Sequence, residues 1–538
     1  MKTGVSYKQE PVTGQYDAII IGSGMGALTT AALLSKQGKK VLVLERHYTA
    51  GGFTHMFKRN DYEWDVGVHY VGEVMDKRTA LAIMFDYITD GKLEWADMGE
   101  VYDRIIFGDK EYQLVKGKER LRQQLKDYFP APADQTAIDQ YFALLDASAK
   151  SAQGFFMDKA LPKLVSGLIG GFMKRPFYKF SDKTTLQTLQ EITQNKELIG
   201  LLTSQYGDYG MEPSRGSFSI HAMVAKHYLK GGAYPVGGCT SIAACIEPII
   251  EKAGGKIYTN AEVAEILVKD NKAIGVKMKD GKEIHAPMVI SSAGVHNTFE
   301  RLLPLEVATK NGLLSTIANV KPSAAHISLY IGLKHTAEEL NLPKANYWIY
   351  PSYDHDENMR RFLADDSAPF PVVYISFPSA KDPDFGNRYP GKATIEIITF
   401  APFEKFAQWD GTRWKKRGED YEAYKENIAQ KLLQHLYERE PQVKDKIDFY
   451  ELSTPLSTKH FVNYQHGEIY GLEHTPERFR LKNLRPQTPI KNLYLTGQDI
   501  VTVGIGGALF SGVLTASAIM GKNLLGDIIK KGREAAAH

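Results

Sequence analysis

An α/β fold with a parallel β-sheet is predicted by two features of the sequence. Residues 18–21 and 41–44 form short apolar runs, and a glycine-rich turn and a stretch with apolar residues at helical spacing lie between them. Near the other end, a further apolar run at residues 493–495 is followed by a second glycine-rich stretch of helical character. Short apolar runs that alternate with helices are typical of strands buried in a parallel sheet. We therefore expect a Rossmann-like domain.

The first turn, Gly22-Ser-Gly24-Met-Gly26, has the spacing of a dinucleotide-binding loop. Gly22 would allow the tight turn, Gly24 the approach of the backbone to a pyrophosphate, and Gly26 the close packing of helix on strand. Glu45 stands at the end of the second strand, where an acidic side chain accepts hydrogen bonds from a ribose. The pattern predicts a bound dinucleotide; glycines that serve only the turn are the alternative.

Composition excludes several classes of protein. The chain has 538 residues, enough for two or three domains, and its formal net charge of +3 is too small over this length to indicate a nucleic-acid partner. Its two cysteines, Cys239 and Cys245, provide neither a disulfide framework nor a cysteine-rich metal site. We therefore expect buried thiols and no bound metal. A cytoplasmic location is also expected, since the N-terminus lacks the apolar centre of a secretory signal.

The region that follows contains a second pair of glycines, Gly51 and Gly52, and then the strand-like run YEWDVGVHYVG at residues 62–72. The paired glycines predict a second close approach of the backbone to the ligand, with a plain turn as the alternative. Residues 76–234 are predicted to be mostly helical, with apolar residues at helical spacing over 76–87, 117–128, 134–152 and 184–202.

Residues 155–180 differ from the other predicted helices. Leu161, Leu164, Leu168 and Phe172 would share one face, and lysine and arginine residues flank that face. A helix of this kind can lie on a membrane surface or cover a hydrophobic tunnel. The sequence leaves both interpretations open, and peripheral contact with the inner face of a membrane is one of them.

Strands are predicted to dominate from residue 256. Asp270-Asn271 and Asp280-Gly281 predict hairpin turns after a helix at 240–253. A second domain with antiparallel strands at 325–331, 372–377 and 394–400 and an amphipathic helix around 428–436 is expected over residues 296–484. Neither a metal-binding nor a nucleophile motif appears in this part of the sequence.

The C-terminal motif has Gly497 and Asp499 directly after the apolar run, and the stretch Gly504-Ile-Gly506-Gly507-Ala508 opens a helix expected to reach about residue 525. A simple NAD-dependent dehydrogenase has no need for a second glycine-rich site far from the first. This motif therefore favours FAD over NAD.

The first and last glycine-rich motifs, together with YEWDVGVHYVG, resemble the flavoproteins of the phytoene desaturase and amine oxidase type. GGFTH and DVGVHYVG resemble most the retinol saturase and carotenoid isomerase branch. The resemblance implies a discontinuous FAD-binding domain of the glutathione-reductase type, formed by residues 1–75, 235–295 and 485–538. An α+β substrate domain, residues 76–234 and 296–484, would be inserted into it.

The resemblance also implies which residues hold FAD. A main-chain group of Val263 would meet the adenine, Asp499 the ribityl or phosphate region, and the N-terminus of the last glycine-rich helix the pyrimidine edge of the flavin. The full set is Gly22, Gly24, Gly26, Ala27, Glu45, Arg46, Gly51, Gly52, Phe53, Thr54, Gly67, Val68, Val263, Gly497, Asp499, Gly506, Gly507 and Ala508. His69 and Tyr70 are the candidate catalytic residues, with a role in loop shape as the alternative, and His55 is a weaker candidate.

The implied activity is oxidoreduction or isomerisation at a carbon–carbon double bond of a long apolar polyene, such as a retinoid, a carotenoid or an unsaturated fatty acid. Saturation or cis–trans isomerisation through reduced FAD is favoured, and NAD(P)H acting through a partner protein is a candidate electron donor. A carotenoid desaturase, an amine oxidase and a non-catalytic escort of prenylated proteins are the alternatives. Nothing in the sequence indicates the oligomeric state.

Overall fold

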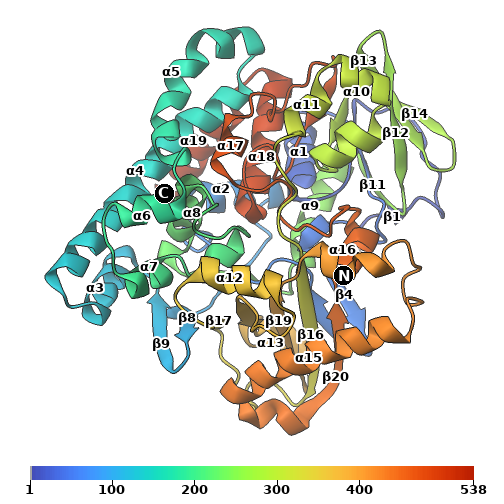
Figure 1. Ribbon diagram of the computed structural model, residues 1–538. Coiled ribbons are helices and arrows are strands. Elements are labelled where there is room, and N and C mark those ends of the chain that lie inside the picture. The colour runs from blue at the N-terminus through green and yellow to red at the C-terminus, as the bar shows by residue number, and fades with distance from the viewer. Residues whose placement is uncertain (1–2, 538) are drawn as a thin grey trace.

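The computed structural model describes residues 3–537, and it confirms the α/β fold (Figure 1). The central sheet has six strands, all paired in parallel. In spatial order they are β1 (Val5–Ser6), β11 (Lys256–Thr259), β3 (Val41–Leu44), β2 (Ala18–Ile21), β15 (Val289–Ser291) and β21 (Leu493–Leu495). The beginning, middle and end of the chain thus share one sheet, whereas the domain boundaries given above stay a prediction.

Both faces of this sheet are covered, which explains why its strands are continuously apolar. Ile20 and Val43 face α1 (Met25–Lys36), α9 (Thr240–Lys252) and α18 (Gly504–Met520). Ile19 and Leu42 face the antiparallel sheet of β12 (Val263–Lys269), β13 (Lys272–Met278) and β14 (Glu283–His285). The predicted turn between β12 and β13 is present, with positive φ at Asp270 and Asn271.

The predicted helical region contains most of the helices on the left of Figure 1. They are α2 (Ala80–Thr89), α3 (Lys118–Tyr128), α4 (Pro132–Ala160), α5 (Lys163–Ser181), α6 (Thr185–Gln190), α7 (Lys196–Leu202) and α8 (Phe218–His227). Two of the predicted helices are each interrupted. Pro162 separates α4 from α5, so Leu161 lies outside the face predicted for it, and Asn195 caps a separate α7.

The region also contains strands that the sequence analysis did not predict: β7 (Trp95–Asp97), β8 (Val101–Phe107), β9 (Lys110–Val115) and β10 (Gly232–Pro235). The hairpin of β8 and β9 extends the edge of a sheet whose other strands lie more than 200 residues later in the chain. Pairing over that distance gives no local signal.

The second sheet has seven strands, in the order β20 (Ile447–Ser453), β16 (His326–Lys334), β19 (Lys392–Phe400), β18 (Val373–Ser376), β17 (Asn346–Tyr350), β8 and β9. The predicted strands at 325–331, 372–377 and 394–400 correspond to β16, β18 and β19. The predicted amphipathic helix is α15 (Glu419–Arg439), which packs Leu432, Leu433 and Leu436 on the sheet. This sheet and α15 form the lower part of the molecule in Figure 1.

Shorter elements complete the fold. They are β4 (Met56–Arg59), β5 (Tyr62–Asp65), β6 (Val71–Gly72), α10 (Leu305–Lys310), α11 (Leu313–Ile317), α12 (His355–Ala364), α13 (Pro378–Lys381), α14 (Phe385–Arg388), α16 (Pro455–Val462), α17 (Pro476–Arg480) and α19 (Leu524–Ala537). The C-terminal helix ends earlier than predicted, because Gly521 takes a left-handed conformation and α19 leaves α18 at 116°. Within residues 3–537 no single helix is both long and apolar enough to span a membrane. Only when α18 and α19 are taken together, as a bent pair, are the length and the apolar composition sufficient.

Candidate active site

A cavity of about 420 Å³ lies between the carboxyl ends of the central strands and the seven-stranded sheet. Its volume is in the range of small-molecule sites in proteins. One half is lined by the loops that follow β2, β3, β15 and β21, and the other half by side chains of β16 to β19. Ligands of open parallel sheets bind at this end of the strands.

The first glycine turn has the geometry that a pyrophosphate requires. Gly22 has a φ of +90°, which favours glycine. A Cβ at Gly24 would meet no atom within 4 Å, so its backbone is open to the cavity at the N-terminus of α1. A Cβ at Gly26 would lie 2.7 Å from the backbone nitrogen of Gly497. Gly26 is therefore the point where the two ends of the chain meet.

Glu45 lies in the cavity wall at the end of β3. Its Oε2 accepts hydrogen bonds from the backbone N–H and the hydroxyl of Ser23, at 2.9 and 2.7 Å, and its Oε1 accepts one from the N–H of His47 at 2.8 Å. A carboxylate oxygen accepts about two hydrogen bonds. Oε1 thus has room for a ribose hydroxyl, while Oε2 holds the first turn in place.

The second glycine pair closes onto the first turn. Gly51 and Gly52 have φ values of +125° and +58°, and a Cβ at Gly52 would lie 2.8 Å from the Cα of Gly24. Phe53 follows and packs on Gly67, where a Cβ would be 3.1 Å from the Phe53 side chain. The two predicted close approaches of backbone to ligand therefore lie side by side.

Asp499 ties the C-terminal motif to two other loops. Its carboxylate accepts hydrogen bonds from the backbone N–H groups of Val295 and Leu472, both at 2.9 Å, and the residue is 5% exposed. The N-terminus of α18 follows, and Gly504, Ile505 and Ala508 line the cavity.

The cavity wall contains most of the residues predicted to hold FAD. They are Gly22, Gly24, Gly26, Glu45, Arg46, Gly51, Gly52, Phe53, Thr54, Gly67, Val68, Val263, Gly497, Asp499 and Ala508. His69 and His55 also line it, whereas Ala27, Tyr70, Gly506 and Gly507 lie behind the wall. Ala27 is buried within α1, and a Cβ at Gly507 would collide with the backbone of Thr502. The open Gly24 backbone, the helix N-termini and Glu45 fit a dinucleotide such as FAD.

His69 and Glu396 form a buried pair at the wall. The Nδ1 of His69 lies 2.8 Å from Glu396, whose side chain is fully buried. Burial lowers the pKa of His69 to about 4 and raises the pKa of Glu396 to about 8. The imidazole is therefore neutral at pH 7, so it suits hydrogen bonding better than the supply of a proton.

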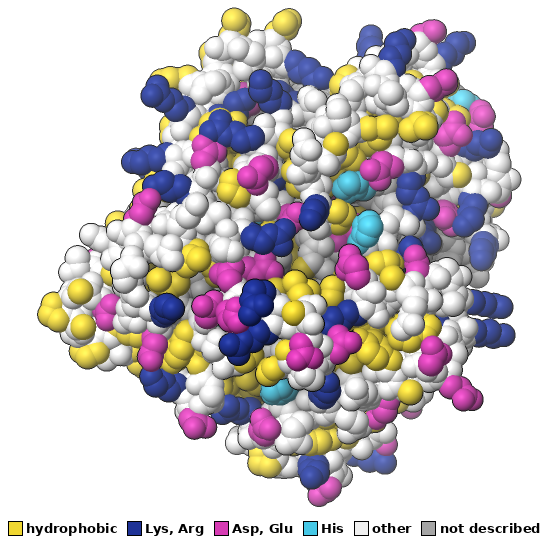
Figure 2. Space-filling model, viewed as in Figure 1, with side chains coloured by type: hydrophobic (Ala, Val, Ile, Leu, Met, Phe, Trp, Pro, Cys, Tyr) yellow, Lys and Arg dark blue, Asp and Glu magenta, His cyan; other side chains and the backbone are white. Residues whose placement is uncertain are grey.

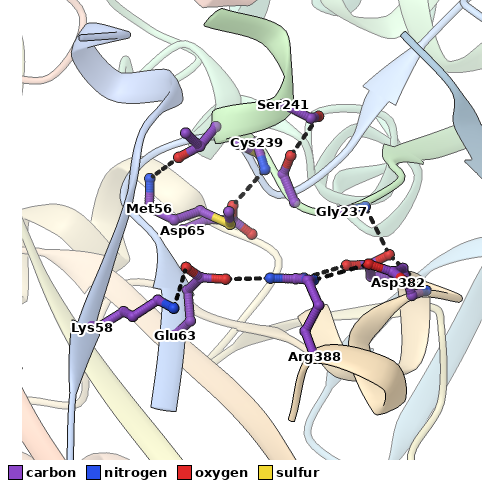
Figure 3. Close-up of polar contacts among 12 residues, drawn as sticks. Met56, Lys58, Glu63, Asp65, Gly237, Cys239, Ser241, Asp382 and Arg388 are labelled. Carbon is purple, nitrogen blue, oxygen red and sulfur yellow. Dashed lines mark hydrogen bonds and ion pairs between the residues drawn. The ribbon is translucent and has the colours of Figure 1, made fainter. Parts of the chain in front are cut away.

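A polar network supports the loop that carries His69. Figure 3 shows Arg388 between Glu63 and Asp382, and Asp65 accepting a hydrogen bond from the backbone of Cys239 at 3.2 Å. These contacts join β5 to α14, to the residue that follows α13 and to the start of α9. They also explain Cys239, whose buried thiol is held against the backbone of Val68.

Glu396→Gln should change how stability depends on pH. The raised pKa of Glu396 means that the folded protein keeps a proton that the unfolded chain loses, so the free energy of unfolding falls as pH rises from 4.5 to about 8. Glutamine retains an acceptor for the N–H of Asp65 and removes this loss. Between pH 5 and pH 8, the free energy of unfolding of the variant should therefore rise relative to that of the wild type by at least about 1.4 kcal/mol, which is equivalent to one pKa unit.

The measurement is urea denaturation at both pH values, with Glu404→Gln, an exposed glutamate, as the matched control. Equal pH dependence in the wild type and Glu396→Gln would contradict a buried, protonated Glu396. Asp65 and Lys381, the charged neighbours of Glu396, are present in both proteins.

The second half of the cavity consists of residues that the sequence analysis missed. Aromatic and aliphatic side chains from three strands and two loop segments surround it: Trp348, Val372, Tyr374, Ile398, Phe400 and Tyr470. His326 and Asp208 are the ionisable groups among them. No local motif identifies these residues, because buried aromatic residues on strands also form ordinary cores.

Known proteins resemble this chain over nearly its whole length. All-trans-retinol 13,14-reductase of Danio rerio is 38% identical over 94% of this chain and 86% of its own, and that of Homo sapiens is 36% identical over 97% and 88%. Prolycopene isomerase 1 of an Oncidium hybrid is 24% identical over 94% and 84%.

A solved structure, an oxidoreductase from Methanosarcina mazei, superposes with a TM-score of 0.61 at 17% identity, over 94% of this chain and all of its own, which shows a shared fold. The model of the family described as flavin containing amine oxidoreductase matches residues 28–520. The resemblance found in the glycine-rich motifs is thereby confirmed. The chain belongs to the flavin containing amine oxidoreductase family.

Proposed function

We propose that this protein binds FAD and uses the reduced flavin to reduce a carbon–carbon double bond of a long apolar polyene. The observation that carries the proposal is the continuity of the cavity. It runs from the glycine turn at Gly24 to the aromatic half around Trp348 and Tyr374. A dinucleotide cofactor and an apolar substrate can thus share one site.

Relatives support the choice of substrate and reaction. The proteins that are 36–38% identical are named for the reduction of all-trans-retinol, and the one at 24% for the isomerisation of prolycopene. We therefore propose a retinoid as the preferred substrate and reduction as the reaction. Isomerisation without net reduction, carotenoid desaturation and amine oxidation are outcomes of the test below.

The residues of this chain provide orientation and the exclusion of water. The Gly22–Gly26 turn and Glu45 would hold the nucleotide, and the loop of Gly51, Gly52 and Phe53 would hold the ring system. A bound flavin supplies a hydride to the substrate. His69 would be available at the cavity wall as a neutral imidazole, and the aromatic half would keep water from the reacting bond.

The test is anaerobic photoreduction of the flavin in the purified protein, followed by incubation with retinoids, carotenoids, unsaturated fatty acids and amines. A product heavier by two hydrogens than a retinoid supports the proposal. An unchanged mass with a shifted absorption spectrum indicates isomerisation, and loss of two hydrogens indicates desaturation. Oxidation of an amine with no change in any polyene would overturn it.

We also propose that electrons reach the flavin from NAD(P)H through a partner protein. Incubating the oxidised protein with NADH or NADPH, with and without a flavin-dependent reductase, tests this. Bleaching of the flavin absorbance that requires the reductase supports the proposal. Equally fast bleaching by NADPH alone would contradict it.

We propose further that α5 docks on an anionic membrane surface, and that the protein lies in the cytoplasm against the inner face of that membrane. Leu164, Leu168 and Phe172 share one face of α5 and are 86–87% exposed. Hydrophobic side chains protrude at the top of the molecule in Figure 2, where α5 lies in Figure 1, with basic side chains below them. Exposed leucine and phenylalanine flanked by lysine are typical of helices that lie in the lipid interface.

Replacing Leu164, Leu168 and Phe172 together by serine should abolish vesicle binding. The wild type should sediment with vesicles of phosphatidylcholine and phosphatidylserine, and the triple variant should bind at least about 10-fold more weakly because its apolar face is lost. Leu305→Ser with Leu363→Ser removes exposed hydrophobic residues elsewhere and serves as the control. Equal sedimentation of the triple variant would rule out α5 as the docking surface.

A further inference from the structure

Asp208 is the carboxyl group of the aromatic half of the cavity. Four acidic residues line the cavity, among the residues that the structure describes: Glu45, Asp208, Glu262 and Asp499. Glu45, Glu262 and Asp499 belong to the loops of the nucleotide half. Asp208 instead follows Gly207, whose carbonyl accepts a hydrogen bond from Tyr470 and whose Cα lies against Trp348.

Hydrogen bonds around Asp208 show where its proton is. The hydroxyl of Tyr70 lies 2.9 Å from Oδ2 of Asp208 and 3.0 Å from Oδ2 of Asp103. A hydroxyl has one proton, so it donates to only one of the two carboxyl groups at a time. The other carboxyl must then donate its own proton to the hydroxyl oxygen. One of the two acids is therefore neutral.

Asp103 is the better partner for a negative charge. Its carboxylate accepts hydrogen bonds from Asn346 at 2.8 Å and from Gln205 at 3.0 Å, and it lies in the protein interior. Among the residues that the structure describes, the side chain of Asp208 has no hydrogen-bond partner besides Tyr70. Burial, with the charge of Asp103 beside it, raises the pKa of Asp208 well above its usual value, whereas burial raises the pKa of Asp103 to about 6. The neutral acid is thus Asp208.

The other ionisable groups that line this half of the cavity are poor proton donors. Glu396 keeps its proton at pH 7, but it lies behind His69 and is not part of the cavity lining. Burial lowers the pKa values of His69 and His326 to about 4, so both are unprotonated at pH 7. Burial raises the pKa values of Tyr374 and Tyr470. Lys381 has a lowered pKa of about 8, but its Nζ is bound to the carbonyl of His69 and to Ser376 and Asn346, outside the cavity wall.

We propose that Asp208 is the proton donor of the reduction, an inference that rests on the proposed function. At rest the proton of Asp208 lies in its hydrogen bond to Tyr70, and it leaves that bond in the reaction. The polyene gains a hydride at one carbon of the double bond, and the π electrons form a new C–H bond with this proton at the other. The polyene is reduced, the flavin is oxidised, and Asp208 is left as a carboxylate. Tyr70 then turns its hydroxyl proton to Asp208, which makes Tyr70 a positioning residue; water restores the proton afterwards.

The experiment is a single turnover of photoreduced holoenzyme with all-trans-retinol, followed by stopped-flow absorbance and product mass. Asp208→Asn should react at least about 100-fold more slowly than the wild type, the usual minimum for loss of a general acid. Flavin content, binding of retinol to the oxidised protein and reoxidation by ferricyanide should be unchanged. Asp109→Asn, an exposed aspartate on the β8–β9 turn, is the matched control.

The pH profile separates a proton donor from a structural residue. The wild-type rate should fall as pH rises through the pKa of Asp208, and Asp208→Asn should show no such fall. Tyr70→Phe removes a hydrogen bond that favours the carboxylate, so the fall should move to higher pH.

Each outcome decides the question. If the wild type converts no polyene, the proposed function is wrong and the inference fails with it. If the wild type converts retinol and Asp208→Asn reacts within threefold of it, only the role of Asp208 is wrong. If Asp208→Asn loses its flavin, the pH profiles of the wild type and of Tyr70→Phe decide instead. A wild-type rate that does not depend on pH would overturn the role of Asp208.

Discussion

Replacing Gly24 with valine should release the flavin and leave the fold intact. A Cβ at Gly24 would meet no protein atom within 4 Å, and the φ of −63° suits any residue. The added side chain would occupy the space through which the backbone approaches the pyrophosphate. Flavin affinity should fall at least about 100-fold, equivalent to about 2.7 kcal/mol. Flavin absorbance per protein and the melting temperature of the flavin-free protein measure the two effects separately.

Gly26→Ala is the informative contrast to Gly24→Val. Its Cβ would lie 2.7 Å from the backbone nitrogen of Gly497, so the two ends of the chain would be forced apart. We expect a lower melting temperature even without flavin, together with loss of the flavin. If Gly24→Val kept its flavin, the cavity beside the first turn would not be the pyrophosphate site.

The nucleotide half of the site could be predicted because its signals are local. Gly22, Gly24 and Gly26 lie within five residues of one another, and the conformation and contacts of each follow from the turn itself. The C-terminal motif was predicted in outline only. Gly504 and Ile505 line the cavity in place of Gly506 and Gly507, because the rotation of α18 about its axis is set by its packing on α1.

The substrate half could not be predicted because its residues come from distant strands. His326, Trp348, Tyr374 and Phe400 meet only after β16 to β19 have paired. Asp208 lies in a stretch of sequence, YGDYG, without a motif. Its chemistry depends on Asp103, which lies on β8, a strand that was not predicted within the mostly helical region. Without that strand the two acids could not be placed together.

Asp499→Ala should cost about 2–6 kcal/mol of stability in the flavin-free protein. The carboxylate accepts hydrogen bonds from the backbone N–H groups of Val295 and Leu472 in a site that is 5% exposed. Alanine leaves both donors buried without an acceptor, at about 1–3 kcal/mol each. Asparagine keeps one acceptor, so Asp499→Asn should lie between alanine and the wild type. The measurement is urea denaturation of all three proteins without flavin.

Asp527→Ala on α19, an exposed aspartate, is the control and should leave the midpoint unchanged. The flavin-free comparison matters because a residue that only contacts the cofactor would change nothing when the cofactor is absent. A wild-type midpoint for Asp499→Ala would show that the two N–H groups find other acceptors. If stability instead falls from the wild type to Asp499→Asn and then to Asp499→Ala, Asp499 joins the loops at Val295 and Leu472 to the end of β21 without the flavin. The flavin would then bind to a cavity wall that is already formed.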